Sequence, residues 1–150
     1  MLFLLIGCST KANEKDDLKW FNSEEKAIEY GLQNEKIKES DILEILDLNG
    51  ERFVVFKFKV SEGEGINVAQ IAKKKKKYSW YTITNRIVVK SKQGSLDAKI
   101  EVESKKGQQF KLYTGVEKNP EKPDVIIEDE GITPIVDQET GLYYAIKSLK

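Results

Sequence analysis

From Asp41 onward, apolar side chains recur at every second position along much of the chain, and this alternation restricts the fold more than any other feature. A period of two places successive side chains on opposite faces of a β-strand, whereas a helix needs a period near 3.6. Ile42–Leu48 and Arg52–Val60 flank Asn49-Gly50, the strongest short signal for a β-hairpin. We therefore predict a hairpin whose two strands are joined by a type I′ turn at Asn49-Gly50.

Further short strands follow at intervals of about ten residues, which is typical of antiparallel sheets. The predicted strands are Ile66–Ala72, Tyr78–Asn85, Ile87–Lys90, Ala98–Val102, Phe110–Val116, Val125–Ile127, Ile132–Val136 and Leu142–Ile146. Ser61–Gly65 is predicted to be a loop, and Gly94 and Gly107 are predicted to lie in turns. Two prolines in Lys118–Pro123 break the pattern.

One segment, Trp20–Glu35, has the pattern of a helix. Asn22 and Ser23 are suitable N-caps, and carboxylates in the following turn favour the helix dipole. Its apolar stripe consists of Ala27, Ile28, Gly31 and Leu32. We predict an α+β domain over residues 20–150 that is mainly antiparallel β, with this N-terminal helix packed on a curled sheet or β-sandwich.

The first residues have the pattern of a bacterial lipobox, Leu5-Ile6-Gly7-Cys8. In that pattern the cysteine receives diacylglycerol and further acyl chains such as palmitate, and it becomes the new N-terminus. Residues 1–7 are then the remnant of a signal peptide, and residues 8–19 are the lipidated cysteine and a flexible, polar tether. The apolar run is short and carries no Lys or Arg, so we expect translation to start upstream of Met1.

This interpretation predicts a lipoprotein anchored to the extracytoplasmic face of the cell membrane through lipid on Cys8. The alternative is a cytosolic protein whose first strand happens to end in Gly-Cys. No stretch approaches the length of about 20 apolar residues that a transmembrane helix needs. A diacylated cysteine is sufficient as an anchor, because each buried methylene contributes about 0.8 kcal/mol.

The chain contains no histidine, and Cys8 is its only cysteine. Catalytic triads with histidine, Cys-His pairs and Cys/His zinc sites are therefore excluded. The 25 basic and 25 acidic residues balance, so no overall field attracts nucleic acid, and we expect no specific nucleic-acid partner. We predict a non-catalytic binding module in the cell envelope, without a metal or another cofactor.

The candidate contact surface is the lysine run Lys73, Lys74, Lys75, Lys76 and Lys77 with the aromatic residues Tyr78, Trp80 and Tyr81. Five cations beside aromatic rings could bind an anionic envelope polymer, a membrane or a protein. The simpler interpretation is a hairpin tip that charge keeps soluble. Period-two alternation places Tyr78 and Trp80 on one face of their strand and Tyr81 on the other, and a buried Trp with an exposed Tyr is the common outcome.

The acidic residues near the C-terminus offer a second, weaker candidate. They are Glu128, Asp129, Glu130, Asp137 and Glu139. Their spacing is not that of an EF-hand, so we interpret them as solvated turns and not as a calcium site. Paired carboxylates could also serve a small envelope hydrolase, which needs no histidine. This is the alternative function, although no two carboxylates stand out.

Several short segments together resemble uncharacterised small lipoproteins of spore-forming Gram-positive bacteria. The segments are Glu24–Leu32, Val68–Ile71, Tyr78–Tyr81, Thr133–Pro134 and Gly141–Tyr144, spread over most of the chain after the tether. None of them is specific on its own. The resemblance implies the lipid anchor and the mainly β fold, and it transfers no activity and no site residue beyond Cys8.

Overall fold

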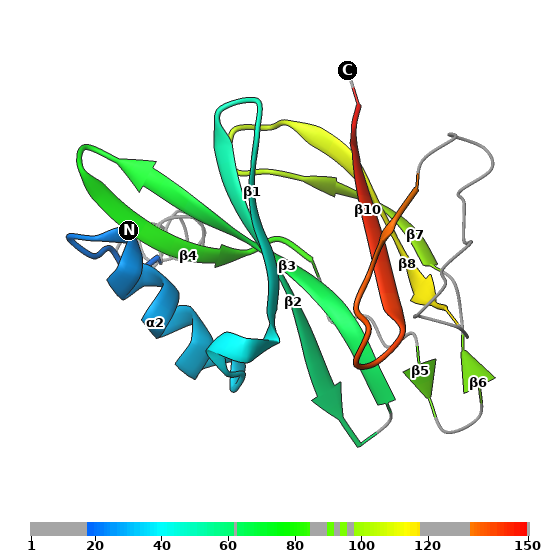
Figure 1. The fold of residues 1–150 in the computed structure, drawn as a ribbon. Helices are drawn as coiled ribbons and strands as arrows, with labels where there is room; N and C mark the ends of the chain where they lie inside the picture. Colours follow the sequence, from blue (N-terminus) through cyan, green and yellow to red (C-terminus); the bar gives the residue numbers. More distant parts are fainter. Residues whose placement is uncertain are drawn as a thin grey trace, which may run out of the picture.

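The computed structural model describes residues 18–61, 63–84, 90–91, 94–95, 98–117 and 133–149. These residues form one α-helix, one 3-10 turn and two antiparallel sheets (Figure 1). The elements are α2 (Glu24–Glu35), η1 (Glu39–Asp41), β1 (Ile42–Leu48), β2 (Glu51–Val60), β3 (Gly63–Lys74), β4 (Lys77–Thr82), β5 (Lys90–Ser91), β6 (Gly94–Ser95), β7 (Ala98–Glu103), β8 (Gln109–Val116), β9 (Ile135–Val136) and β10 (Leu142–Ser148). The predicted class, α+β with mainly antiparallel β, is confirmed.

The first sheet has the strand order β1-β2-β3-β5-β6, and β4 also pairs with β3. Strand β3 is twelve residues long. It pairs with β2 along one edge, while its other edge pairs with β5 at Gly63–Glu64 and with β4 at Ala69–Lys74. The second sheet has the order β7-β8-β10-β9. The β1–β2 and β7–β8 turns lie at the same end of the molecule (Figure 1).

Two apolar cores lie on opposite faces of the first sheet. Because strand side chains alternate, β2 sends Phe53 and Val55 to one face and Val54 and Phe56 to the other. Phe53 and Val55 join a cluster with residues of the second sheet, and the ring centroids of Phe53 and Phe110 are 5.1 Å apart. Val54 and Phe56 pack with the residues that helix α2 covers. Helix, first sheet and second sheet therefore form three layers (Figure 1).

The turn between β1 and β2 has the predicted conformation. Asn49 has φ 50° and Gly50 has φ 85°, and positive φ at both central residues is what a type I′ turn requires. The Asn49 side chain also donates hydrogen bonds to Gln108 Oε1 (2.7 Å) and Ser148 Oγ (3.1 Å). The turn thus fastens the first sheet to the end of the second.

The predicted helix is present, but it begins at Glu24 and not at Trp20. Ser23 is the N-cap, and its side chain accepts a hydrogen bond from the Lys26 amide at 3.2 Å. The start is late because Phe21 forms a β-bridge with Tyr78, so the residues before Ser23 are held in an extended conformation. On the buried side of the helix, Gly31 lies directly against the ring of Trp80.

Three predicted loops and turns are shorter than expected. The prediction of a loop at Ser61–Gly65 is wrong in part, because β3 already begins at Gly63 and is paired on both edges there. Gly94 pairs with Ser91 in a short strand and is not in a turn. In the lysine run only Lys75 and Lys76 form the turn, with φ 52° and 72°. Pairing with neighbouring strands has overridden the low strand propensity of these residues.

The alternation predicted for β7 is confirmed, whereas that predicted for β8 is confirmed only in part, because Tyr113 on its predicted polar face is 5% exposed. Gly107 has the positive φ of a turn residue, 87°. Residues 85–89 and 118–132 lie outside the described residues. The strand Val125–Ile127, the break at Lys118–Pro123 and most of the Ile87–Lys90 strand therefore stay predictions. Cys8 and the rest of residues 1–17 also lie outside them.

Candidate anion-binding site

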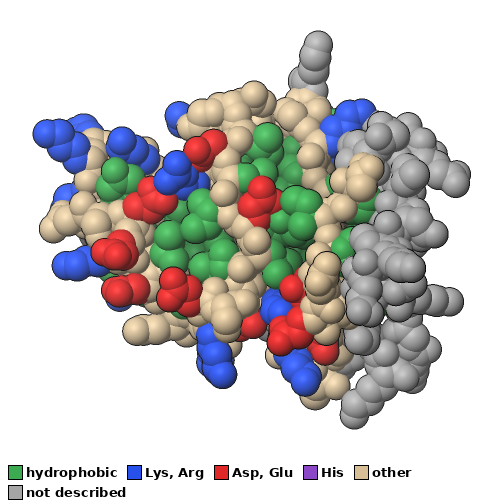
Figure 2. Space-filling view, viewed as in Figure 1, with side chains coloured by type: hydrophobic (Ala, Val, Ile, Leu, Met, Phe, Trp, Pro, Cys, Tyr) green, Lys and Arg blue, Asp and Glu red, His purple; other side chains and the backbone are tan. Residues whose placement is uncertain are grey.

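The lysine run lies at the tip of the β3–β4 hairpin. Lys73 and Lys74 end β3, Lys75 and Lys76 form the turn, and Lys77 begins β4. All five side chains are exposed. Figure 2 shows basic side chains gathered around this tip. The hairpin therefore presents a local group of positive charges on a chain whose net charge is zero.

Trp80 is not part of this surface, so its assignment as a contact residue is wrong. It is 4% exposed, and its ring centroid lies 5.7 Å from that of Phe56. Its indole N–H donates to Glu35 Oε2 at 3.4 Å. The physical reason is the position of helix α2, which covers this face of β4 and places Gly31 against the indole.

The two tyrosines of the candidate surface are half-buried and lie on opposite faces, as predicted. Tyr78 packs at the edge of the core under helix α2, and the Lys73 ammonium lies 5.6 Å from its ring centroid. On the other face, the Lys105 ammonium lies 5.5 Å from the ring centroid of Tyr81. Both contacts are cation–π pairs, so each ring holds a lysine at the surface.

A second pair of lysines, Lys105 and Lys106, comes from the β7–β8 turn and lies beside the first group. Lys73, Lys74, Lys105 and Lys106 line a cavity of about 370 Å³ together with Leu18, Trp20, Gln70 and Ala72. We call this cavity the lysine groove. Trp20 also lines a neighbouring cavity of about 480 Å³ with Lys74, Lys75 and Lys77. Trp20 thus borders two cavities that lysines from the two hairpins line.

The four ammonium groups of the lysine groove make no ion pair with any residue in the described ranges. The ion pairs of the described part of the chain join Arg52 to Glu24 and Asp47, and Lys57 to Asp137 and Glu139. Four nearby cations raise the local positive potential and favour an anionic ligand. The groove therefore has the charge of an anion-binding site.

Two carboxylates near the groove form ion pairs with Arg52. A cavity of about 450 Å³ next to the groove shares Gln70, Lys73 and Lys106 with it and also contains Glu24 and Asp47. Arg52 contacts both carboxylates through paired hydrogen bonds of 2.8–3.1 Å. These bonds lower the pKa of Asp47 and raise that of Arg52. The two acidic side chains are thereby engaged away from the lysines.

A buried carboxylate positions the second pair of lysines. Glu51 is 5% exposed and accepts hydrogen bonds from Ser104 Oγ (2.6 Å), Gln108 Nε2 (2.7 Å), Gln70 Nε2 (2.7 Å) and the Lys106 amide (3.2 Å). Gln70 Oε1 in turn accepts from the Lys105 amide at 2.9 Å. Burial by itself raises the pKa of Glu51, but these hydrogen bonds outweigh it and the pKa is lowered. An ionised carboxylate thus fixes the β7–β8 turn against β2 and β3.

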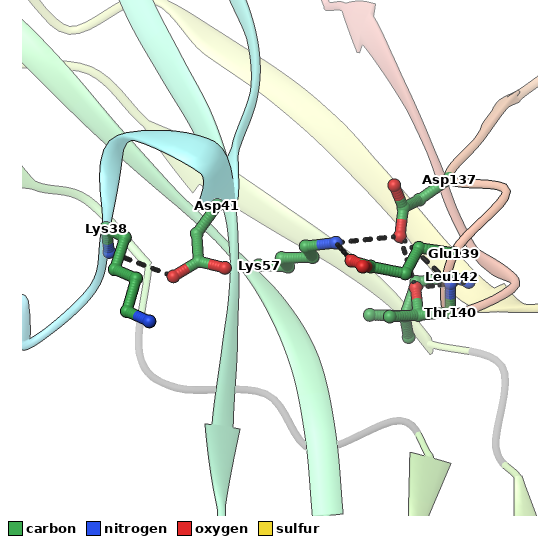
Figure 3. A network of polar contacts seen from close by, with 7 residues as sticks. All are labelled: Lys38, Asp41, Lys57, Asp137, Glu139, Thr140 and Leu142. Atoms are coloured by element: carbon green, nitrogen blue, oxygen red, sulfur yellow. Dashed lines mark hydrogen bonds and ion pairs between the residues drawn. The ribbon is translucent and has the colours of Figure 1, made fainter.

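One acidic side chain near the C-terminus, Asp137, has a different role from the one predicted. Lys57 Nζ lies 3.1 Å from Asp137 Oδ2 and 2.5 Å from Glu139 Oε1 (Figure 3). Asp137 also accepts from the Thr140 amide and hydroxyl. Lys57 and Asp137, whose side chains are 11% and 16% exposed, form a half-buried ion pair. The Glu139 side chain is 79% exposed and lies in a turn, as predicted.

Hydrogen bonds account for the shifted pKa values of Lys57 and Asp137. Burial by itself lowers the pKa of Lys57, but its hydrogen bonds to Glu139 and Asp137 outweigh burial and raise it. For Asp137, burial is outweighed by hydrogen bonds from Thr140 and Lys57, and the pKa is lowered. Glu128, Asp129 and Glu130 lie outside the described residues. Within the described ranges, no three acidic or Cys side chains are grouped as a metal site.

Comparison of the chain with protein-family models, curated proteins and solved structures finds no match in any of the three. In the described part of the chain, no helix combines the length and the apolar character that crossing a membrane requires.

Proposed function

We propose that this chain is a non-catalytic binding module, held at the extracytoplasmic face of a membrane by lipid on Cys8, and that the lysine groove binds its anionic ligand. One observation carries the second part of the proposal. Four lysines from two different hairpins line a single cavity, and none of them makes an ion pair with a described residue. Like charges repel, so an anionic ligand that contacts several of these lysines would be bound favourably.

The hydrogen bonds that position the lysines of the groove support this role. Glu51 and Gln70 hold the backbone of the β7–β8 turn, so Lys105 and Lys106 stay beside the β3–β4 hairpin without help from a ligand. A site that is positioned in advance loses less conformational entropy on binding. The exposed ends of the lysine side chains favour an extended, multiply charged ligand over a small buried one.

Inorganic polyphosphate is a suitable probe for the groove. The full chain with Cys8→Ala should bind it, and the K74Q/K106Q variant should bind about tenfold more weakly, as expected for the loss of two exposed ionic contacts. Isothermal titration calorimetry at low and high salt measures both affinities. Binding should weaken steeply with salt, because the screening length falls to about 8 Å at physiological ionic strength.

The matched control is K26Q/K59Q, which removes the same charge at two exposed positions outside the groove. This control should bind polyphosphate nearly as tightly as the parent. If both double variants lose affinity equally, the effect comes from net charge and the groove is not the site.

The anchor is tested separately in cells that express the complete reading frame. Inhibition of the lipoprotein signal peptidase with globomycin should cause a precursor to accumulate, and Cys8→Ala should abolish incorporation of labelled palmitate. The protein should then leave the membrane fraction, since no acyl chain holds it. Recovery of unlipidated wild-type protein in the cytosol would contradict the anchor.

A further inference from the structure

We infer that the ligand of the lysine groove is the anionic phospholipid surface of the membrane itself, and that the groove is the side of the domain that faces the bilayer. This inference rests on the proposed function, because it names the ligand of the same site. It is carried by three observations: the kinds of side chain in the groove, their arrangement around Trp20, and the place where the described chain begins.

The groove combines cations with apolar side chains. Leu18 and Trp20 lie among Lys73, Lys74, Lys105 and Lys106 in the same cavity, and both are half-buried, so part of each is accessible. A purely hydrophilic phosphate polymer would offer nothing to these two side chains. The boundary of a bilayer offers both partners at once, phosphate groups for the lysines and a semi-apolar layer in which Trp side chains are enriched.

Trp20 borders more than one group of lysines. It lines the lysine groove and also the cavity formed with Lys74, Lys75 and Lys77 at the tip of the β3–β4 hairpin. Lysines of the β3–β4 and β7–β8 hairpins therefore lie near an aromatic side chain that can enter the headgroup region. Such an arrangement fits a surface with many phosphates better than one small ligand.

The described chain begins at this groove. Leu18 is the first described residue and lines the cavity, and only nine residues lie between it and Cys8. The ten residue-to-residue steps from Cys8 to Leu18 span at most about 36 Å when fully extended. Lipid on Cys8 would therefore hold the groove within about one bilayer thickness of the membrane, where the effective concentration of headgroups is high.

The test uses the full chain with Cys8→Ala, so that the acyl anchor does not mask the groove. Binding is measured by co-sedimentation with phosphatidylcholine vesicles that contain or lack phosphatidylglycerol. The parent should bind the anionic vesicles more tightly, and K74Q/K106Q should bind them about 25-fold more weakly, about fivefold for each lysine near an anionic surface. K26Q/K59Q is the matched control and should retain the preference. Residues 1–7 are present in every variant and act equally on both vesicle types.

Tryptophan fluorescence reports the orientation. The chain has two tryptophans, of which Trp80 is buried under helix α2 and Trp20 lines the groove. Vesicles with spin-labelled headgroups should quench the emission of the parent, and Trp20→Phe should remove the quenched component and leave the Trp80 emission unchanged. Quenching that persists in this variant would place another face on the membrane and overturn the inference.

The remaining outcomes separate the two proposals. Binding to polyphosphate with no preference for anionic vesicles would overturn the membrane inference and leave the proposed anion-binding function standing. If the parent bound neither polyphosphate nor anionic vesicles, both the membrane inference and the proposed anion-binding function would be wrong.

The sequence also has carboxylates at positions 14, 16 and 17, just before Leu18. If vesicles bind only the E14Q/D16N/D17N variant, the groove is occupied by this acidic segment of the chain and not by the membrane. That result would overturn the inference.

Discussion

Glu51→Ala is expected to lower the free energy of unfolding by about 3–5 kcal/mol, because it leaves several buried donors without an acceptor. The Glu51 carboxylate accepts hydrogen bonds from three side chains and from the Lys106 amide. The alanine variant buries little polar surface of its own, but Gln70, Ser104 and Gln108 lose their common partner. Urea denaturation of the parent and the variant measures the difference.

Glu51→Gln is the informative companion variant, because it keeps the shape and removes the charge. The loss of stability that E51Q causes should depend on pH. The pKa of Glu51 is lowered in the folded state, so its contribution is fully present above the unfolded value of about 4.3 and is lost as pH falls through the folded pKa. The stability gap between parent and E51Q should therefore be widest near neutral pH and close in acid. A gap that stays constant from neutral to acidic pH would show that Glu51 is not ionised in the fold.

Gly31→Ala is expected to have the second large effect on stability. It should destabilise the protein, although helix propensity alone would predict stabilisation. In an open helix position this change would stabilise the protein by about 1 kcal/mol. Here the new Cβ would lie 2.0 Å from Trp80 Cδ2, far inside van der Waals contact with a buried ring. Helix α2 must move away from β4, so we expect the free energy of unfolding to fall by about 2–3 kcal/mol, measured by urea denaturation.

A double-mutant cycle with Trp80→Leu isolates the contact. With a smaller side chain at position 80, Gly31→Ala should be nearly neutral or stabilising. Asn34→Ala, at an exposed position of the same helix, controls for propensity. Equal destabilisation by Gly31→Ala in both backgrounds would mean that the Trp80 ring is not the cause.

The elements that were predicted correctly depend on neighbours in the sequence. Asn49-Gly50 requires only that two adjacent residues accept positive φ, and Ser23 caps a helix through an amide three residues away. Alternation along β2 indicates one apolar face and a second face that begins apolar and turns polar, whereas the structure buries both. The pattern could not show which element covers which face, since that depends on how the helix and the second sheet are placed.

The candidate site was only half predicted for the same reason. The run Lys73–Lys77 can be recognised directly in the sequence. Lys105 and Lys106 lie beside it because distant strands pair and because hydrogen bonds of Glu51 and Gln70 hold the β7–β8 turn. Glu51 stands at the start of a strand and gives no periodic signal. Trp80 was included because it is close in sequence, but strand geometry turns it away from its neighbour Tyr81.

Strand β3 has a consequence for how the domain opens. Its backbone pairs with β2 on one edge and with both β4 and β5 on the other, so three hairpin-like units share one strand. The β3–β4 tip can fray without disturbing the pairing of β2 with β3, because the two ladders lie on different edges. Amide protons of β3 that bond to β2 belong to a ladder that fraying of β4 leaves intact. The lysines at the β3–β4 tip are thus carried on a part of the sheet that can open while the ladder beneath it stays paired.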